Sequence, residues 1–218
     1  MSSSELLHNV SLRDQAAESI RAGITAGEFE PGEIYSATMI AERFGVSATP
    51  VREAMLDLAS VGLVEAVRNR GFRVLTVSET DLDEINEIRL FLEPPMVRKV
   101  AESASDEQIA ALEQHVVDIE AAASSTDVER FLIADRRFHL QLLELAGNHR
   151  LTRLVGQLRD QTRLFGLAGL AKKGNLTASA GEHRDIFEAL RDRRGEDAFA
   201  LTHAHLEHAR GIWAGLPE

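Results

Sequence analysis

The chain has 218 residues, of which 44% are hydrophobic, and it contains no cysteine. This composition is sufficient for one or two packed domains, and it excludes a disordered chain, a disulfide scaffold and thiolate chemistry. The net charge of −11 argues against a broad nucleic-acid-binding surface, although a few basic residues can still form a local positive face.

The sequence contains no targeting or membrane signal. No uninterrupted apolar segment approaches the roughly 20 residues that a membrane helix needs. The first residues, MSSSELLHNV, lack the basic and apolar regions of a secretory signal. We therefore expect a cytoplasmic protein with no membrane partner, in which any metal site is built from His, Asp and Glu.

The N-terminal part of the chain has the pattern of a helix-turn-helix. Its first apolar residues recur at every fourth position, as Leu12, Ala16, Ile20 and Ile24. This period predicts a helix over residues 11–26. Ser36 is suited to begin a short second helix that ends at Gly45, and a third helix is expected over residues 47–60. Two helices joined by a short glycine-containing turn are typical of the helix-turn-helix.

After Gly62 the pattern changes from helical to alternating. Residues 63–67 and 72–77 predict two strands, and the intervening residues 68–71, Arg-Asn-Arg-Gly, predict a turn with basic side chains at its tip. A hairpin at this position after two helices is the wing of a winged helix-turn-helix.

The start of the third predicted helix carries side chains that are suited to DNA. Ser47 and Thr49 offer hydroxyls to phosphates, and Arg52 can reach the acceptors of guanine. The alternative for Arg52 is an ordinary surface ion pair with Glu53 or Asp57. The full candidate DNA-binding set is Arg43, Ser47, Thr49, Arg52, Arg68, Arg70 and Gly71.

From Ser78 onward the sequence shows only helical periods, separated by turns that include residues 173–175 and 194–196. About six helices are expected. The fold class is therefore mainly α, with a winged helix-turn-helix over residues 1–77 and an all-helical domain over residues 78–218.

Several residues of the helical domain are candidate metal ligands. Asp135 and His139 lie one turn apart on the apolar face of the helix predicted over residues 127–146, where both need a partner. If the last turn centres on Arg194, His183 and His205 lie at the same height in an antiparallel hairpin. This spacing alone also leaves His203 and His208 as candidates.

Residues 44–74 strongly resemble the winged helix-turn-helix of GntR-family regulators. The resemblance rests on three segments: Ser-Ala-Thr-Pro-Val-Arg-Glu-Ala-Met, Gly-Leu-Val-Glu and Arg-Asn-Arg-Gly-Phe-Arg-Val. It implies a homodimer bound to an inverted-repeat operator in double-stranded DNA, with the third helix in the major groove. The wing tip at residues 70–71 would then lie in or near the minor groove.

Residues 78–218 resemble the FCD effector domain of the FadR subfamily. Matched motif by motif, this resemblance implies a divalent metal ion held by Asp135, His139, His183 and His205. Three imidazoles and one carboxylate suit zinc foremost, and also nickel, manganese or iron.

Arg89 lies on the apolar face of the first helix of this domain, so it must pair with an anion. One interpretation is an internal ion pair with Glu93, Asp135 or another carboxylate. The other, which FCD domains suggest, is effector binding, in which Arg89 holds the carboxylate of a small organic acid beside the metal.

These patterns predict a DNA-binding transcriptional regulator, expected to be a repressor, whose operator affinity is controlled by a small carboxylate effector. One alternative is a metal-dependent enzyme acting on a small organic acid, although no general base accompanies the candidate ligands. The other is a constitutive DNA-binding dimer with a purely structural metal. We expect a regulator and no enzymatic activity.

Overall fold

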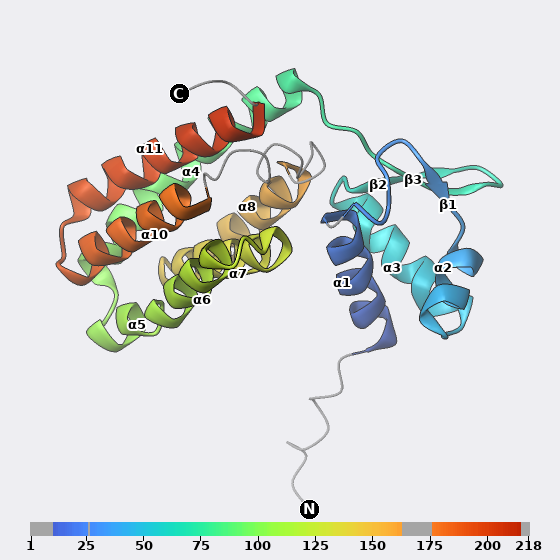
Figure 1. Ribbon diagram of the computed structural model, residues 1–218, viewed down its shortest axis with the longest axis horizontal. Coiled ribbons are helices and arrows are strands. Elements are labelled where there is room, and N and C mark those ends of the chain that lie inside the picture. Colours follow the sequence, from blue (N-terminus) through green and yellow to red (C-terminus); the bar gives the residue numbers. More distant parts are fainter. Residues whose placement is uncertain (1–10, 26, 163–175, 215–218) are drawn as a thin grey trace, which may run out of the picture. The chain divides into compact units, whose positions relative to one another are not determined.

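The computed structural model describes residues 11–25, 27–162 and 176–214 (Figure 1). The fold is mainly helical, with one small antiparallel sheet, as the sequence predicted. The chain forms two compact units, and each is described by itself. We refer to residues 1–76 as the N-terminal unit and to residues 77–218 as the C-terminal unit.

Three helices form the body of the N-terminal unit: α1 (Leu12–Thr25), α2 (Ala37–Phe44) and α3 (Ala48–Ser60). The turn between α2 and α3 follows from local chemistry. The Ser36 hydroxyl accepts the Met39 N–H at 3.1 Å and caps α2, while Gly45 ends α2 with a left-handed φ of 68°. α3 packs against both α1 and α2, which fixes the helix-turn-helix.

The sheet has three strands, β1 (Ile34–Tyr35), β2 (Val64–Val67) and β3 (Gly71–Val74), in the order β1-β3-β2. β2 and β3 form the predicted wing. The sequence did not predict β1, whose two residues become a strand only by pairing with β3. A Cβ at Gly71 would lie 2.4 Å from the Tyr35 carbonyl oxygen, so this pairing requires glycine there.

Helices alone form the described part of the C-terminal unit: α4 (Glu79–Ser103), α5 (Asp106–Ala110), α6 (Glu113–Ser124), α7 (Val128–Leu145), α8 (His149–Thr162), α10 (Leu176–Arg191) and α11 (Gly195–Ala214). The segment 106–124, which showed no break in the sequence pattern, is divided into two helices at residues 111–112. The expected break at 173–175 lies outside the described residues. None of the described helices is long and apolar enough to cross a membrane.

The core of the C-terminal unit brings distant helices together. α11 lies along α4, α6 packs on α7, and α10 contacts both α11 and α6 (Figure 1). Large side chains from α7 and α10, including Phe138 and Phe187, are fully buried between these helices. The α10–α11 hairpin turns at residues 192–194, where Arg193 has a φ of 61° and donates to the carbonyl oxygens of Ala101 and Ala104. This contact ties the turn to the end of α4.

Candidate metal centre and DNA-binding surface

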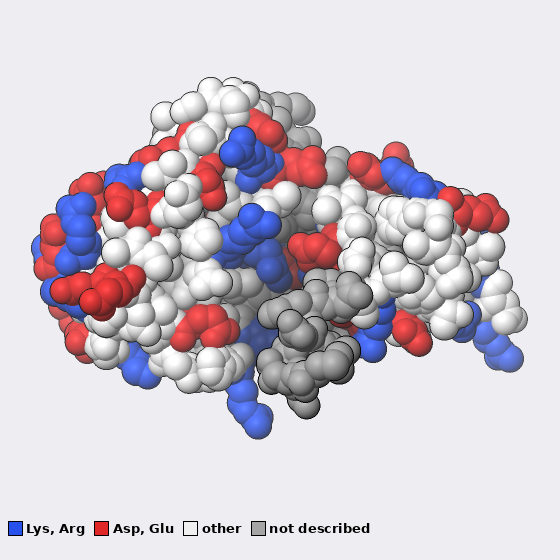
Figure 2. Space-filling view, turned by 90° about the horizontal axis from the view of Figure 1, so that it is seen from below, with Lys and Arg blue, Asp and Glu red and all other residues white. Residues whose placement is uncertain are grey.

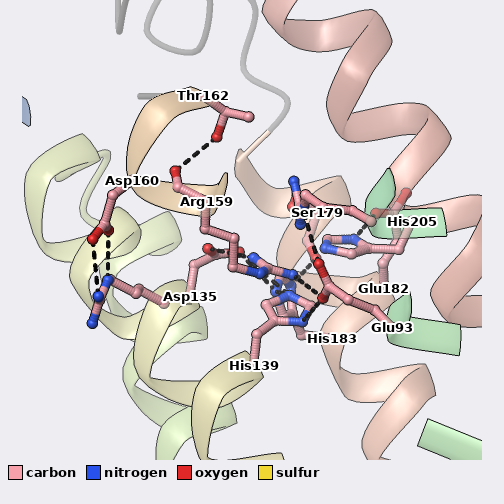
Figure 3. Close-up of polar contacts among 12 residues, drawn as sticks. Glu93, Asp135, His139, Arg159, Asp160, Thr162, Ser179, Glu182, His183 and His205 are labelled. Carbon is pink, nitrogen blue, oxygen red and sulfur yellow. Dashed lines mark hydrogen bonds and ion pairs between the residues drawn. The ribbon is translucent and has the colours of Figure 1, made fainter. Parts of the chain in front are cut away.

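Four potential ligands converge inside the C-terminal unit (Figure 3). α7 supplies Asp135 and His139, α10 supplies His183 and α11 supplies His205. One ligand atom from each residue lies within 4.8 Å of all the others, and the three histidines are at most 3% exposed. We call these residues the four-residue cluster.

The distances within the four-residue cluster suit a single ion. His139 Nε2 lies 3.1 Å from His183 Nε2, and His183 Nε2 lies 3.1 Å from Asp135 Oδ1. His139 Nε2 lies 3.6 Å from the same carboxylate oxygen. Ligands at about 2.0–2.1 Å from a tetrahedral ion are about 3.3 Å from one another. Asp135, His139 and His183 therefore have the spacing of a coordination shell, and all four residues have ligand atoms within 4.8 Å of one another.

The hydrogen bonds around the four-residue cluster define which ring nitrogens are free. His183 Nδ1 donates to the Ser179 carbonyl oxygen at 2.7 Å, and His205 Nδ1 donates to the Glu182 carboxylate at 2.7 Å. Each ring therefore carries its lone pair on Nε2, and the Nε2 of His183 lies beside Asp135 Oδ1. Two imidazole lone pairs beside an ionised carboxylate are a donor set that fits a divalent cation.

The electrostatic environment keeps the ligands in the protonation state that metals need. Burial, reinforced by His183, lowers the pKa of His205 to about 4. Burial and the charge of Arg159 hold the pKa of His139 well below its ordinary value. Burial raises the pKa of Asp135, but the neighbouring His183 and the charge of Arg159 outweigh it and leave this pKa well below normal. At neutral pH the imidazoles of His139 and His205 are therefore neutral, and the Asp135 carboxylate is ionised.

A buried ion-pair network borders the four-residue cluster. Arg89 and Glu93 on α4 are 5% and 0% exposed, and Arg159 on α8 is 4% exposed. Arg89 Nε donates to Glu93 Oε1 at 2.7 Å, and Arg159 Nη2 donates to Glu93 Oε2 at 2.7 Å. Arg159 Nη1 lies 3.3 Å from Asp135 Oδ2. Of the partners foreseen for Arg89, the structure therefore selects Glu93.

Arg159 was missed by the sequence analysis, although a signal was present. It follows the buried Val155 by four residues and thus lies on the inner face of α8. Its Nε is buried and has no hydrogen-bond partner among the described residues. Such an atom is costly unless a ligand or water accepts its hydrogen.

The two other candidate histidines lie outside the four-residue cluster. The side chain of His203 is 41% exposed and lies 3.4 Å from Glu207. The side chain of His208 is 64% exposed and its Nδ1 lies 2.6 Å from Glu182 Oε1. The α10–α11 hairpin thus brings His205, and neither of its neighbours, beside His183.

In the N-terminal unit, the predicted DNA-binding residues divide by position. Ser47, Thr49 and Arg52 are exposed at the start of α3, and Arg68 and Arg70 are exposed at the tip of the β2–β3 hairpin. The Ser47 hydroxyl makes no capping bond to α3, contrary to a simple N-cap role. The Ser47 hydroxyl is therefore available to form a hydrogen bond with another group.

Ion pairing separates the arginines of the N-terminal unit into two groups. Residues 1–77 contain seven arginines and no lysine, and all seven lie within the described residues. Four of them form ion pairs: Arg13 with Asp57, Arg21 with Glu18, Arg43 with Glu28, and Arg73 with Glu65. Arg52, Arg68 and Arg70 form no ion pair with any described residue. The three unpaired arginines are those at α3 and the wing tip.

Two details refine the sequence-based interpretation of these arginines. Asp57, one of the partners considered for Arg52, instead accepts two hydrogen bonds of 2.5 Å from Arg13. Arg43 is held by Glu28 and lies over the Phe29 ring, 5.4 Å from its centroid. Arg43 is therefore less available for DNA than Arg52.

The surface charge agrees with a local contact area. On the face shown in Figure 2, basic side chains are interspersed with acidic ones and do not gather in one broad basic surface. This face therefore offers no broad basic surface to DNA, in agreement with the net charge of −11.

A winged helix-turn-helix with unpaired arginines on its third helix and wing defines a DNA-binding transcriptional regulator. The family description "Bacterial regulatory proteins, gntR family" matches residues 12–74, and the FCD domain matches residues 84–208. The chain belongs to the GntR family of bacterial regulatory proteins and carries an FCD domain.

Relatives along most of the chain are also regulators. The HTH-type transcriptional regulator YdhC of Bacillus subtilis is 31% identical over 84% of this chain and 82% of its own length. The HTH-type transcriptional repressor NanR of Klebsiella aerogenes is 29% identical over 94% of this chain and 86% of its own length. The structure of Escherichia coli McbR matches with a TM-score of 0.85 and 25% identity, over 94% of this chain and 98% of McbR. The chain is thus a transcriptional regulator and not an enzyme.

Proposed function

We propose that the protein is a metal-containing repressor that binds its operator as a homodimer and is controlled by a small carboxylate. The observation that carries the ligand part of this proposal is the buried charge around the four-residue cluster. Arg89 and Arg159 balance Glu93 and Asp135, so a divalent ion would leave this buried group with excess positive charge. Glu182 is a further acidic neighbour, but it is partly exposed, so it neutralises this excess charge less effectively than a buried carboxylate would.

The metal would be held by Asp135, His139, His183 and His205. When bound, the ion supplies a positive charge and open coordination positions for an anionic oxygen. Zinc fits this donor set foremost, with nickel, manganese and iron as further candidates. The convergence of one carboxylate and three imidazoles supports this assignment.

The effector would be a small carboxylate or hydroxycarboxylate beside Arg89. Arg89 and the neighbouring Arg159 already share one carboxylate, that of Glu93, through bonds of 2.7 Å. The unpartnered Nε of Arg159 is a further donor in the same region. A group of arginines and a cation selects anions of limited size, because both the charge and the geometry of a carboxylate are matched.

The DNA-binding residues proposed are Ser47, Thr49 and Arg52 on α3, together with the wing-tip arginines Arg68 and Arg70. Arg52 would read a base, and the wing would contact the backbone or the minor groove. One recognition helix reads few base pairs, so an inverted repeat bound by a homodimer is expected.

An exposed apolar pair supports the homodimer. Phe91 and Ile88 lie one turn apart on α4 and are 72% and 43% exposed. Large apolar side chains that remain exposed on one helix face are favoured to be covered by a partner.

Operator binding, measured with and without zinc and a panel of small carboxylates, tests the proposal. We expect a carboxylate to weaken operator binding by the wild-type protein. Arg89→Ala should lose this response and keep DNA binding, since Glu93 retains Arg159 as a partner. Arg137→Ala, an exposed arginine on α7, serves as the control. Unchanged operator affinity across the panel with zinc present would instead support a constitutive DNA-binding dimer with a structural metal.

A further inference from the structure

Glu182 links two histidines of α11 to α10. Its Oε2 accepts the Nδ1–H of His205 at 2.7 Å, and its Oε1 lies 2.6 Å from Nδ1 of His208. His205 is buried, whereas the side chain of His208 is 64% exposed. The carboxylate therefore lies between a buried ring of the four-residue cluster and a ring at the surface.

We propose that Glu182 is a positioning residue of the metal centre, which holds His205 in the tautomer that can coordinate an ion. This inference rests on the proposed metal site. A neutral imidazole carries its proton on either nitrogen. With the proton on Nδ1 and donated to Glu182, Nε2 presents a lone pair to the other ligands. With the proton on Nε2, an N–H would point at them and coordination through that atom would be blocked.

The other histidines of the four-residue cluster are held differently. His183 Nδ1 donates to a backbone carbonyl, that of Ser179, which no side-chain substitution removes. His139 Nδ1 is 3.7 Å from Glu93 Oε2, which is too long for a hydrogen bond. Within the described residues, Glu182 is thus the one side chain that is hydrogen-bonded to the outer nitrogen of a cluster histidine.

The position of Glu182 in the chain gives it a second effect. It directly precedes His183, so one turn of α10 supplies both a ligand and the group that orients another ligand. Its two oxygens contact residues one turn apart on α11, which fixes the rotation of α11 against α10. Outer carboxylates of this kind typically contribute 10- to 100-fold to metal affinity.

Zinc affinity, measured by competition with a chelator, tests this role in the full-length protein. We expect Glu182→Ala to weaken zinc binding about 10- to 100-fold. Glu182→Gln, which keeps an oxygen acceptor for His205, should weaken zinc binding less. Asp185→Asn removes an exposed carboxylate from the same helix and should leave zinc affinity unchanged. Equal affinity of the wild-type protein and Glu182→Ala would overturn the inference.

The ring tautomers of the metal-free protein, observed by 15N NMR, give a readout that does not depend on zinc. We expect the Nδ1–H form of His205 in the wild-type protein and a mixture of tautomers in Glu182→Ala. An unchanged tautomer in a folded Glu182→Ala variant would refute the positioning role. If the wild-type protein takes up no zinc, the metal proposal fails, whereas the tautomer of His205 still tests the action of Glu182.

Discussion

Replacing Glu93 by glutamine tests whether the two buried arginines of the C-terminal unit depend on its charge. Glu93 is 0% exposed and accepts hydrogen bonds from both Arg89 and Arg159. Burial raises the pKa of Glu93, but the charges and hydrogen bonds of Arg159 and Arg89 outweigh it and lower this pKa below its ordinary value. At pH 7 the carboxylate is therefore ionised, and the nearly isosteric glutamine removes its charge without opening a cavity.

The expected loss is large because the partners cannot reach water. Removing one member of a buried ion pair costs about 3–5 kcal/mol. Arg159 keeps Asp135 as a partner, whereas Arg89 loses the one ion-pair partner that it has among the described residues. Unfolding the C-terminal unit of about 140 residues carries an entropy of roughly 0.3 kcal/mol per degree. The midpoint of thermal unfolding should therefore fall by about 10–17 °C.

Thermal unfolding of the metal-free protein at pH 7, followed by circular dichroism and calorimetry, measures this effect. Glu120→Gln is the matched control, because Glu120 forms a two-bond ion pair with Arg184 but is 39% exposed. The control should lose at most about 1 kcal/mol. Small carboxylates should stabilise Glu93→Gln more than the wild-type protein, since they replace the missing charge. Equal midpoints for Glu93→Gln and Glu120→Gln would refute the reasoning.

Three further predictions concern pH, DNA contact and the wing. The pKa of His205 is about 4 in the folded protein and 6.5 as a free side chain, so the stability that its neutral form contributes is complete above pH 6.5. This stability should be lost as the pH falls toward 4, and the free energy of unfolding in urea, measured on the metal-free protein, should fall by about 3 kcal/mol. His205→Asn should make the free energy of unfolding depend less on pH. Arg52→Ala should weaken specific operator binding by about 1–3 kcal/mol in anisotropy titrations. Arg43→Ala should have a smaller effect because Arg43 is already ion-paired, and equal losses of affinity in the two variants would show that Arg52 does not read a base. Gly71→Ala should lower the unfolding midpoint of the N-terminal unit more than Gly45→Ala. Both glycines have positive φ, but only the Cβ at position 71 would meet backbone atoms, so a smaller effect at position 71 would contradict the observed strand pairing.

Features that depend on neighbouring residues in the chain were determined by the sequence alone. Ser36 and Gly45 bound α2 because capping and left-handed backbone conformations are properties of a few consecutive residues. Asp135 and His139 face the same way because helical geometry fixes a spacing of four residues. The winged helix-turn-helix and the mainly helical class could therefore be predicted without knowing which elements touch.

Contacts between distant elements were decided only by the tertiary structure. β1 exists because Tyr35 lies against β3, and nothing in its own two residues demands a strand. Arg159 and Glu93 are 66 residues apart in the chain, and their pairing depends on how α8 packs against α4. Glu182 contacts His205 only because the α10–α11 hairpin turns at a particular residue. The energy of such contacts depends on burial. A local sequence pattern cannot show whether a polar side chain is buried until the elements that pack against it are known.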